Sequence, residues 1–127
     1  MSGESGSFRF KREERLKGRN EIREVFSRGK RFGCRGAKLF VLKNSLSRNR
    51  ICFTFSRGFR NAVERNRARR LGREAYRYLR PRLAGGCDLI LLVYPETMPA
   101  PVAVVKKNAL AARTAQLSFL LTKAGLL

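Results

Sequence analysis

Residues 61–79 read NAVERNRARRLGREAYRYL, and this stretch decides how the rest of the chain can fold. Placed on a helical wheel at about 100° per residue, its apolar side chains fall within one sector of about 100°, while arginines recur at steps of three or four on the other side. The apolar sector contains Ala68, Leu71, Ala75, Tyr78 and Leu79. The pattern predicts one long amphipathic helix that packs on a sheet and ends before Pro81.

The segments on both sides of this helix predict the sheet. Residues 38–43 (KLFVLK) and 50–57 (RICFTFSR) are rich in aromatic and β-branched residues, and the polar residues 44–49 between them indicate a turn. We therefore expect these two strands to pair with each other in antiparallel fashion. A third strand is expected over residues 88–94, after Gly85-Gly86, and its unbroken apolar run predicts burial on both faces.

Two further helices complete the predicted fold. A short helix is expected over residues 21–28, with Asn20 as its N-cap, and a final helix over residues 104–123. The order is then helix, strand, strand, helix, strand, helix, which describes an α+β fold with a single-layer sheet packed by helices. Residues 1–8 are rich in glycine and serine and are predicted to be a disordered tail, so that residues 9–127 form one domain.

The charge of the chain predicts a polyanionic partner. The sequence has 29 Lys and Arg against 9 Asp and Glu, a formal net charge of +20 on 127 residues. Such a charge repels itself in a small fold, and a nucleic acid would neutralise it. We expect no membrane partner, because no apolar run approaches the roughly 20 residues that span a bilayer. The N-terminus also lacks the pattern of a secretory signal, so the expected location is cytoplasmic.

The arginines of the long helix are suited to RNA. A guanidinium group forms two parallel hydrogen bonds with a phosphate and stacks on exposed bases. Only Glu64 and Glu74 oppose the arginines on this helix, too few for a surface stabilised by internal ion pairs. The alternative is a solvated basic helix with no dedicated partner, but a long face of one sign opposite a clean apolar stripe favours nucleic-acid binding. Arg67 lies about 160° from Arg65 on the wheel, so Arg65-Asn66-Arg67 is not expected to act as one patch.

Nothing in the sequence predicts a catalytic or metal site within the polypeptide. The chain has no histidine, and its three cysteines, Cys34, Cys52 and Cys87, form no CxxC pair, so we interpret them as structural thiols. Its single aspartate, Asp88, begins a predicted strand and is interpreted as a structural polar contact. No pair of glutamates has the spacing of a two-metal phosphodiesterase site.

Residues 55–76 (FSRGFRNAVERNRARRLGREAY) resemble the signature of the bacterial ribonuclease P protein component. In that family a serine and basic residues lead into Asn-Ala-Val, then Arg-Asn-Arg, one variable residue, a basic pair, and Arg-Glu-Ala before an aromatic residue. Residues 15–17, 25–32 and 88–93 resemble the family's N-terminal entry, the segment after its first helix and its late strand. The likeness covers about residues 9–122.

The resemblance implies that the chain joins a catalytic RNA and helps it remove the 5′ leader from precursor tRNA. The holoenzyme is then an endoribonuclease whose catalytic centre and Mg²⁺ belong mainly to the RNA, with no other protein partner required. The resemblance also implies a left-handed crossover from the second to the third strand. Residues of the long helix and of the turn before it are expected to contact the catalytic RNA, namely Arg57, Arg60, Asn61, Arg65, Asn66, Arg67, Arg69, Arg70, Arg73 and Arg77.

The family also implies a cleft between the first helix and the sheet that holds the single-stranded leader. Single strands are bound by aromatic platforms with basic rims, and alternation places Lys38 and Phe40 on one strand face. Phe26 and Phe40 fall where the family has leader-contacting aromatics, although a phenylalanine at such a position can instead belong to the core. Three positions depart from the family: Ile22 replaces a frequent aromatic, Gly58 a usual basic residue, and Arg60 a usual glycine.

Two other classes of protein compete with this interpretation. A ribosomal protein or a general RNA chaperone would share the small size and high charge without any role in cleavage. A self-sufficient metal-dependent nuclease is opposed by the scarcity of carboxylates. Cleavage of precursor tRNA with the catalytic RNA alone, the protein alone, and both together separates the three.

Overall fold

The computed structural model describes residues 12–59, 61–95 and 102–127, with side chains from residue 109 onward in the last range. The predicted tail (residues 1–8) and Arg60 lie outside these residues. The elements are two 3-10 turns, three helices and four strands in the order η1 (Arg12–Glu14), α2 (Arg19–Arg28), β1 (Lys30–Cys34), β2 (Ala37–Lys43), β3 (Arg50–Phe55), α3 (Ala62–Leu79), η2 (Arg80–Arg82), β4 (Cys87–Val93) and α4 (Val102–Lys123). All three predicted helices and all three predicted strands are present, within a few residues of their expected bounds.

The sheet has the strand order β1-β2-β4-β3, which corrects the predicted pairing of β2 with β3. Strand β4 lies between them, antiparallel to β2 and parallel to β3. Its central position follows from its sequence, because Leu89, Ile90 and Leu91 are all fully buried and need strands on both edges and cover on both faces. Helix α3 connects the parallel neighbours β3 and β4, and the left-handed sense of this crossover stays a prediction.

Strand β1 was not predicted. Its sequence, KRFGC, combines two charged residues and a glycine, a weak strand pattern. It forms a hairpin with β2 across a two-residue turn in which Gly36 has φ 87°. Lys30 and Arg31 lie on this edge strand, where charge opposes pairing with another chain. Strand β1 therefore depends on its neighbour β2 more than on its own composition.

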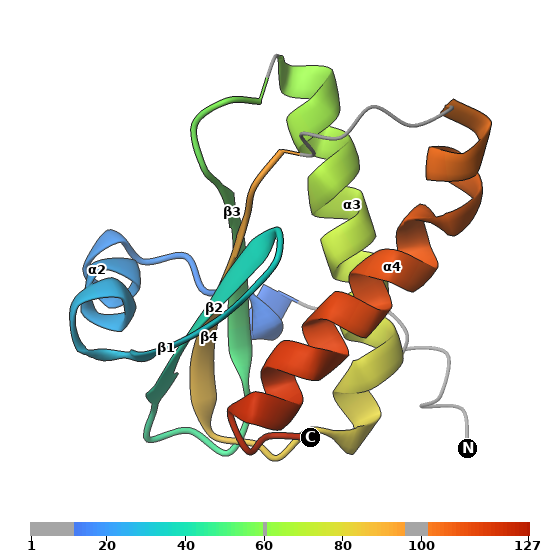
Figure 1. Ribbon diagram of the computed structural model, residues 1–127. Coiled ribbons are helices and arrows are strands. Elements are labelled where there is room, and N and C mark those ends of the chain that lie inside the picture. Colours follow the sequence, from blue (N-terminus) through green and yellow to red (C-terminus); the bar gives the residue numbers. More distant parts are fainter. Residues whose placement is uncertain (1–11, 60, 96–101) are drawn as a thin grey trace.

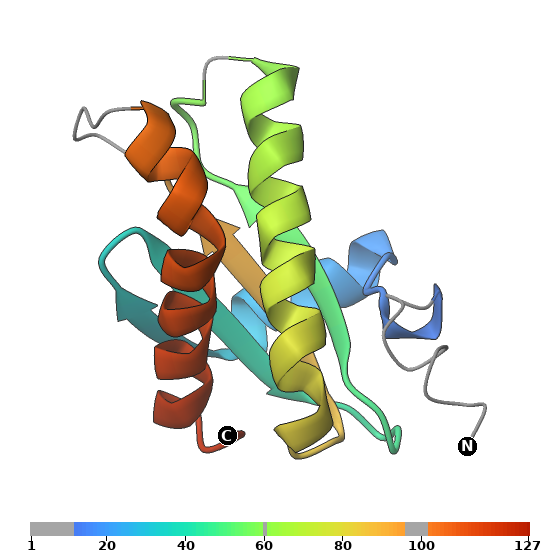
Figure 2. The ribbon, with the colours of Figure 1, turned by 90° about the vertical axis from the view of Figure 1, so that its right-hand side faces the viewer.

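Helices cover both faces of the sheet (Figure 1). Helix α2 lies on one face, and α3 and α4 lie side by side on the other, as Figure 2 shows from the side of these two helices. Strand alternation divides the core accordingly. The larger cluster, with Leu39, Leu91 and Leu117, fills the space between the sheet and α3/α4. The smaller one, Leu16, Val25, Phe40 and Ile90, lies under α2.

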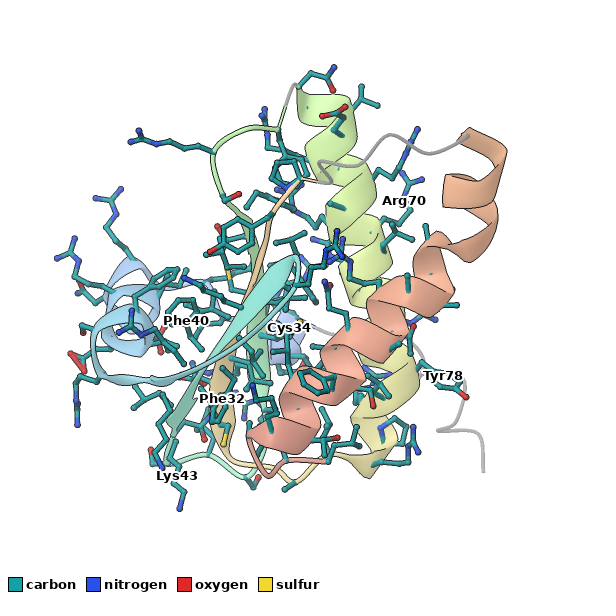
Figure 3. All side chains as sticks on the ribbon, in the orientation of Figure 1. Phe32, Cys34, Phe40, Lys43, Arg70 and Tyr78 are labelled. Atoms are coloured by element: carbon teal, nitrogen blue, oxygen red, sulfur yellow. The ribbon has the colours of Figure 1, made fainter. Side chains whose placement is uncertain are left out.

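The packed side of α3 differs from the predicted apolar stripe by one residue. Tyr78, expected to face the sheet, is 70% exposed, and Figure 3 shows it at the outer side of the helix. Tyr76 is buried instead and meets Phe53 edge to face with 6.5 Å between ring centroids. The reason is Gly72: a Cβ there would lie 2.8 Å from Phe53 Cδ1, so the bare backbone lets α3 approach β3 on the side that carries Tyr76.

The two helix starts depend on different residues. Asn20 is not the N-cap of α2, because that helix begins earlier, at Arg19, with Gly18 in the cap position. Asn61 is the N-cap of α3, and its Oδ1 accepts a hydrogen bond from the Glu64 backbone N–H at 3.0 Å. Asn61, predicted to contact RNA, therefore has a structural role as well.

Candidate nucleic-acid interface

Arg65, Arg69 and Arg73 form a row along α3 that runs beside the outer edge of β3. Arg69 lies with its guanidinium carbon 5.1 Å from the centroid of the Phe55 ring, a cation–π arrangement. Its Nη1 donates to Oδ1 of Asn66 at 2.9 Å. These two contacts hold Arg69 in place at the junction of α3 and β3. Asn66, predicted to contact RNA, thus orients a neighbouring arginine.

Arg15 joins this row from the other end of the chain. It forms a parallel β-bridge with Ile51, and Leu16 N–H donates to the Ile51 carbonyl at 3.0 Å, so the N-terminal segment follows the edge of β3. Burial, and then the neighbouring charges of Arg15 and Arg69, lower the pKa of Arg73. Arg73 is thus close enough to Arg69 and to Arg15, from a distant segment of the chain, for their charges to disfavour its own. Phosphate would relieve that repulsion.

Sequence reasoning missed Arg15 as a site residue. Two signals pointed to this segment, its several basic residues and the likeness of residues 15–17 to the family's N-terminal entry, but neither connected Arg15 with the long helix. We define the arginine row by the residues that share this side of α3 and the adjacent strand edge, namely Arg15, Arg65, Arg69 and Arg73.

The remaining predicted arginines are not all in this row. Arg67 and Arg70 are exposed, and Figure 3 places Arg70 on the side of α3 that faces away from the sheet. Arg77 donates to Glu74 in the last turns of the helix, so part of its charge is balanced within α3. The arginines of this helix therefore face at least two directions, as the wheel positions of Arg65 and Arg67 predicted.

The turn before α3 accounts for one departure from the family pattern. Gly58 has φ 112°, a conformation that L-residues rarely adopt, and a Cβ there would lie 3.2 Å from Pro95 Cγ. A basic side chain at this position would be strained, whereas Arg57 beside it is exposed. Arg60, the other departure here, lies outside the described residues.

The cap of α3 leads to a prediction about Asn61. Asn61→Ala is expected to lower the free energy of unfolding by about 1 kcal/mol, because it removes the acceptor for the Glu64 N–H. Asn61→Ser keeps an N-cap oxygen but removes the amide. Chemical denaturation measures stability, and binding to the catalytic RNA is measured on the same samples. If Asn61→Ser is as stable as the wild type but binds RNA more weakly, the amide itself contributes to the interface. If Asn61→Ala leaves the free energy of unfolding unchanged, the Asn61 cap does not stabilise α3.

The opposite side of the sheet carries the predicted leader-binding residues. Across β2, β4 and β3, the register aligns Lys38 with Leu92 and Leu92 with Thr54, all on the face that α2 partly covers. Lys38 is exposed, and its Nζ lies 6.0 Å from the centroid of the Tyr94 ring. We call Phe26 on α2 together with Lys38, Thr54, Leu92 and Tyr94 the α2-side surface.

The structure separates the roles of the two phenylalanines. Phe26 is 41% exposed, whereas Phe40 is only 6% exposed and lies between α2 and the sheet (Figure 3). Their rings meet edge to face, with 4.8 Å between centroids. Phe40 thus supports Phe26 from below and offers little surface of its own. Ile22, the third departure from the family, is half-buried and packs against the same cluster.

Among the described residues, no group of three His, Cys, Asp or Glu side chains lies close enough to hold a metal ion. Within the same ranges, none of the helices has both the length and the apolarity of a membrane span.

Comparison with known proteins identifies relatives of this chain. The model of the Ribonuclease P family matches residues 10–117. A ribonuclease P protein component from Borrelia duttonii is 41% identical over 87 residues, which cover 68% of this chain and 76% of the relative. One from Natranaerobius thermophilus is 44% identical over 77 residues, 61% of this chain and 67% of the relative.

Solved structures show the same fold. The RNase P protein from Thermotoga maritima matches with a TM-score of 0.69 at 22% identity, over 87% of this chain and 96% of that one. A Staphylococcus aureus RNase P protein mutant with defective mRNA degradation activity matches with a TM-score of 0.73 at 18% identity, over 91% of both chains. With the family match over residues 10–117, the sequence relatives show that this chain belongs to the ribonuclease P protein family.

Proposed function

We propose that this chain is the protein subunit of ribonuclease P and that it binds the catalytic RNA through the arginine row. The observation that carries this proposal is the convergence of Arg15 with Arg69 and Arg73 at the edge of β3, in a chain of this family. Arginines fixed by a sheet edge and by a ring contact are preorganised for a phosphate backbone, which reduces the entropy lost on binding. A ribosomal protein or an RNA chaperone is not favoured, because the relatives are ribonuclease P components.

The proposed contribution of the protein to cleavage is electrostatic and positional. Its charge of +20 screens the repulsion between the catalytic RNA and the precursor tRNA. Leader binding at the α2-side surface would hold the substrate so that the scissile bond meets the catalytic RNA. We place the catalytic centre and the Mg²⁺ in the RNA, and we propose that the cytoplasmic holoenzyme needs no further protein for removal of the leader.

Cleavage of precursor tRNA at low magnesium tests this proposal. We expect efficient release of the leader when the catalytic RNA and the protein are combined, and little with either alone, because the protein replaces part of the counterion screening. Cleavage by the protein alone would show a nuclease site in the polypeptide. Failure of the protein to stimulate the RNA would exclude the proposed subunit role.

The exposure of Phe26 predicts where the leader is recognised. Phe26→Ala is expected to weaken binding of precursor tRNA to the holoenzyme by about 1–3 kcal/mol, the contribution of one base stacked on an aromatic ring, while mature tRNA binds as before. Phe40→Ala is a poor probe, since loss of a buried ring costs about 3–5 kcal/mol of stability. Phe119→Ala, which removes an exposed ring from α4, is the matched control. Equal losses for Phe26→Ala and Phe119→Ala would exclude leader binding at this surface.

A further inference from the structure

Arg50 of β3 connects the sheet with the helix above it. Its Nε and Nη2 donate to the two carboxylate oxygens of Asp88 on β4, at 2.8 and 2.7 Å. Its Nη1 donates to Oε2 of Glu21, in the first turn of α2, at 2.9 Å. Asp88 is buried and also accepts from Nδ2 of Asn44 at 2.8 Å. One guanidinium group thus joins two strands and a helix.

The geometry of this group fixes a direction. A guanidinium is planar and rigid, so the two hydrogen bonds to Asp88 determine its plane. The direction in which Nη1 points is then set by β3 and β4 and not by α2. To accept this hydrogen bond, the Glu21 carboxylate has to lie where Nη1 points, so Arg50 fixes its position relative to the sheet.

Helix α2 needs such a link. It has ten residues, and isolated helices shorter than about 12–15 residues are marginal in water, so its place depends on tertiary contacts. Beneath it, Val25 packs on Phe40 and Ile90. Apolar contact of this kind is non-directional, so it does not fix the position of the helix along the sheet. The apolar cluster holds α2 against the sheet. The hydrogen bonds of Arg50 to Asp88 and Glu21, which we call the Arg50 bridge, determine the position of α2 along the sheet.

The residue at the cap of α2 leaves room for this bridge. A Cβ at Gly18 would lie only 2.3 Å from Oε1 of Glu21. A side chain at position 18 would therefore push the Glu21 carboxylate away from its present place. Glycine here permits the orientation in which the other oxygen, Oε2, meets Arg50.

We propose that Arg50 is a positioning residue for leader binding. Held by Asp88, it holds Glu21 and so sets the place of α2, and with it the exposed ring of Phe26, relative to Lys38 on the sheet. The aromatic and basic parts of the α2-side surface come from different elements, and this bridge determines their spacing. The inference rests on the proposed function, because it concerns the surface assigned to the leader.

The test compares two substitutions on the same helix. Glu21→Gln removes the negative charge from the helix end of the bridge, whereas Glu24→Gln removes the same charge from a pair with Arg28 within α2. In the assembled holoenzyme, Glu21→Gln is expected to reduce the affinity for precursor tRNA relative to mature tRNA about threefold to fivefold, the size of a partly exposed ion pair. Glu24→Gln is expected to leave this ratio unchanged. Both variants should melt close to the wild-type temperature, since the buried Arg50–Asp88 pair is kept.

Two further variants separate positioning from a direct effect of charge. Gly18→Ala displaces the Glu21 carboxylate without changing any charge and should lower the same ratio. Arg50→Lys keeps the charge but loses the planar link, and Glu21→Gln should have no additional effect on the ratio in that background. A full additional effect in the double variant would overturn the inference.

The outcomes distinguish this inference from the function on which it rests. If the wild-type holoenzyme shows no preference for a leader, the proposed leader surface is wrong, and the role of Arg50 with it. If the preference exists and Phe26→Ala removes it, but Glu21→Gln and Glu24→Gln behave alike, only the positioning role of Arg50 is overturned. Equal weakening of both tRNAs by Glu21→Gln would also overturn it.

Discussion

Replacing Arg65, Arg69 and Arg73 together by glutamine is expected to lower the affinity for the catalytic RNA on the order of a hundredfold to a thousandfold at about 0.1 M salt. Each phosphate contact releases a condensed counterion on binding, and three contacts fewer release three counterions fewer. The slope of log affinity against log salt should accordingly become shallower by about 2 to 3. Binding of the protein to the catalytic RNA, titrated at several salt concentrations, measures both quantities.

A second triple variant controls for the loss of net charge. Arg23, Arg35 and Arg82 are exposed and lie outside α3, and their replacement by glutamine lowers the charge by the same amount. We expect a much smaller loss of affinity in that variant. If the two triple variants lose affinity and salt slope equally, the protein binds RNA through its overall charge and the arginine row has no special role. Thermal unfolding of both variants shows whether the ring contact of Arg69 with Phe55 also supports the fold.

The second large effect concerns stability and comes from Asp88. Asp88→Ala is expected to lower the free energy of unfolding by about 3–5 kcal/mol, because it leaves the charge of Arg50 largely buried without its main partner. In the structure the side chains of Arg50 and Asp88 are only 18% and 8% exposed. The hydrogen bonds with Asp88, and less strongly the pairing with Glu21, raise the pKa of Arg50 in spite of its burial. Arginine stays protonated in proteins even without such a partner, so in the Asp88→Ala variant Arg50 cannot avoid the cost by losing its charge.

Urea denaturation of matched variants tests this prediction. Asp88→Ala combined with Arg50→Met should be less destabilised than Asp88→Ala alone, since no charge then remains buried. Glu74→Gln, which breaks the more exposed pair with Arg77, should cost less than about 1 kcal/mol. A loss for Asp88→Ala no larger than that for Glu74→Gln would contradict the structural role of Asp88.

Local patterns in the sequence were sufficient to predict the helices and three of the four strands. The period of α3 follows from residues three and four apart, and the apolar run of β4 from five consecutive residues, 89–93. The family signature lies within the same helix, which is why membership and element order could be proposed together. Lys38 and Phe40 were placed on one face by alternation alone, and the register of the sheet agrees.

The predictions that were wrong, and the residues that were missed, involve contacts between distant parts of the chain. Strand β1 exists because β2 pairs with it, and the pairing of β2 with β3 failed because β4 enters between them. Whether Tyr76 or Tyr78 is buried depends on the closeness of Gly72 to Phe53 on another element. No local pattern records such contacts.

The helices, three of the strands, the charge and the family signature are each carried by neighbouring residues, so all of them could be predicted without the structure. Tertiary structure alone decided which side chains meet. It brought Arg15 to the arginine row, buried Phe40 beneath an exposed Phe26, and joined Arg50 to both Asp88 and Glu21. These contacts join residues 14 to 58 positions apart, and their geometry is set by how the helices pack on the sheet.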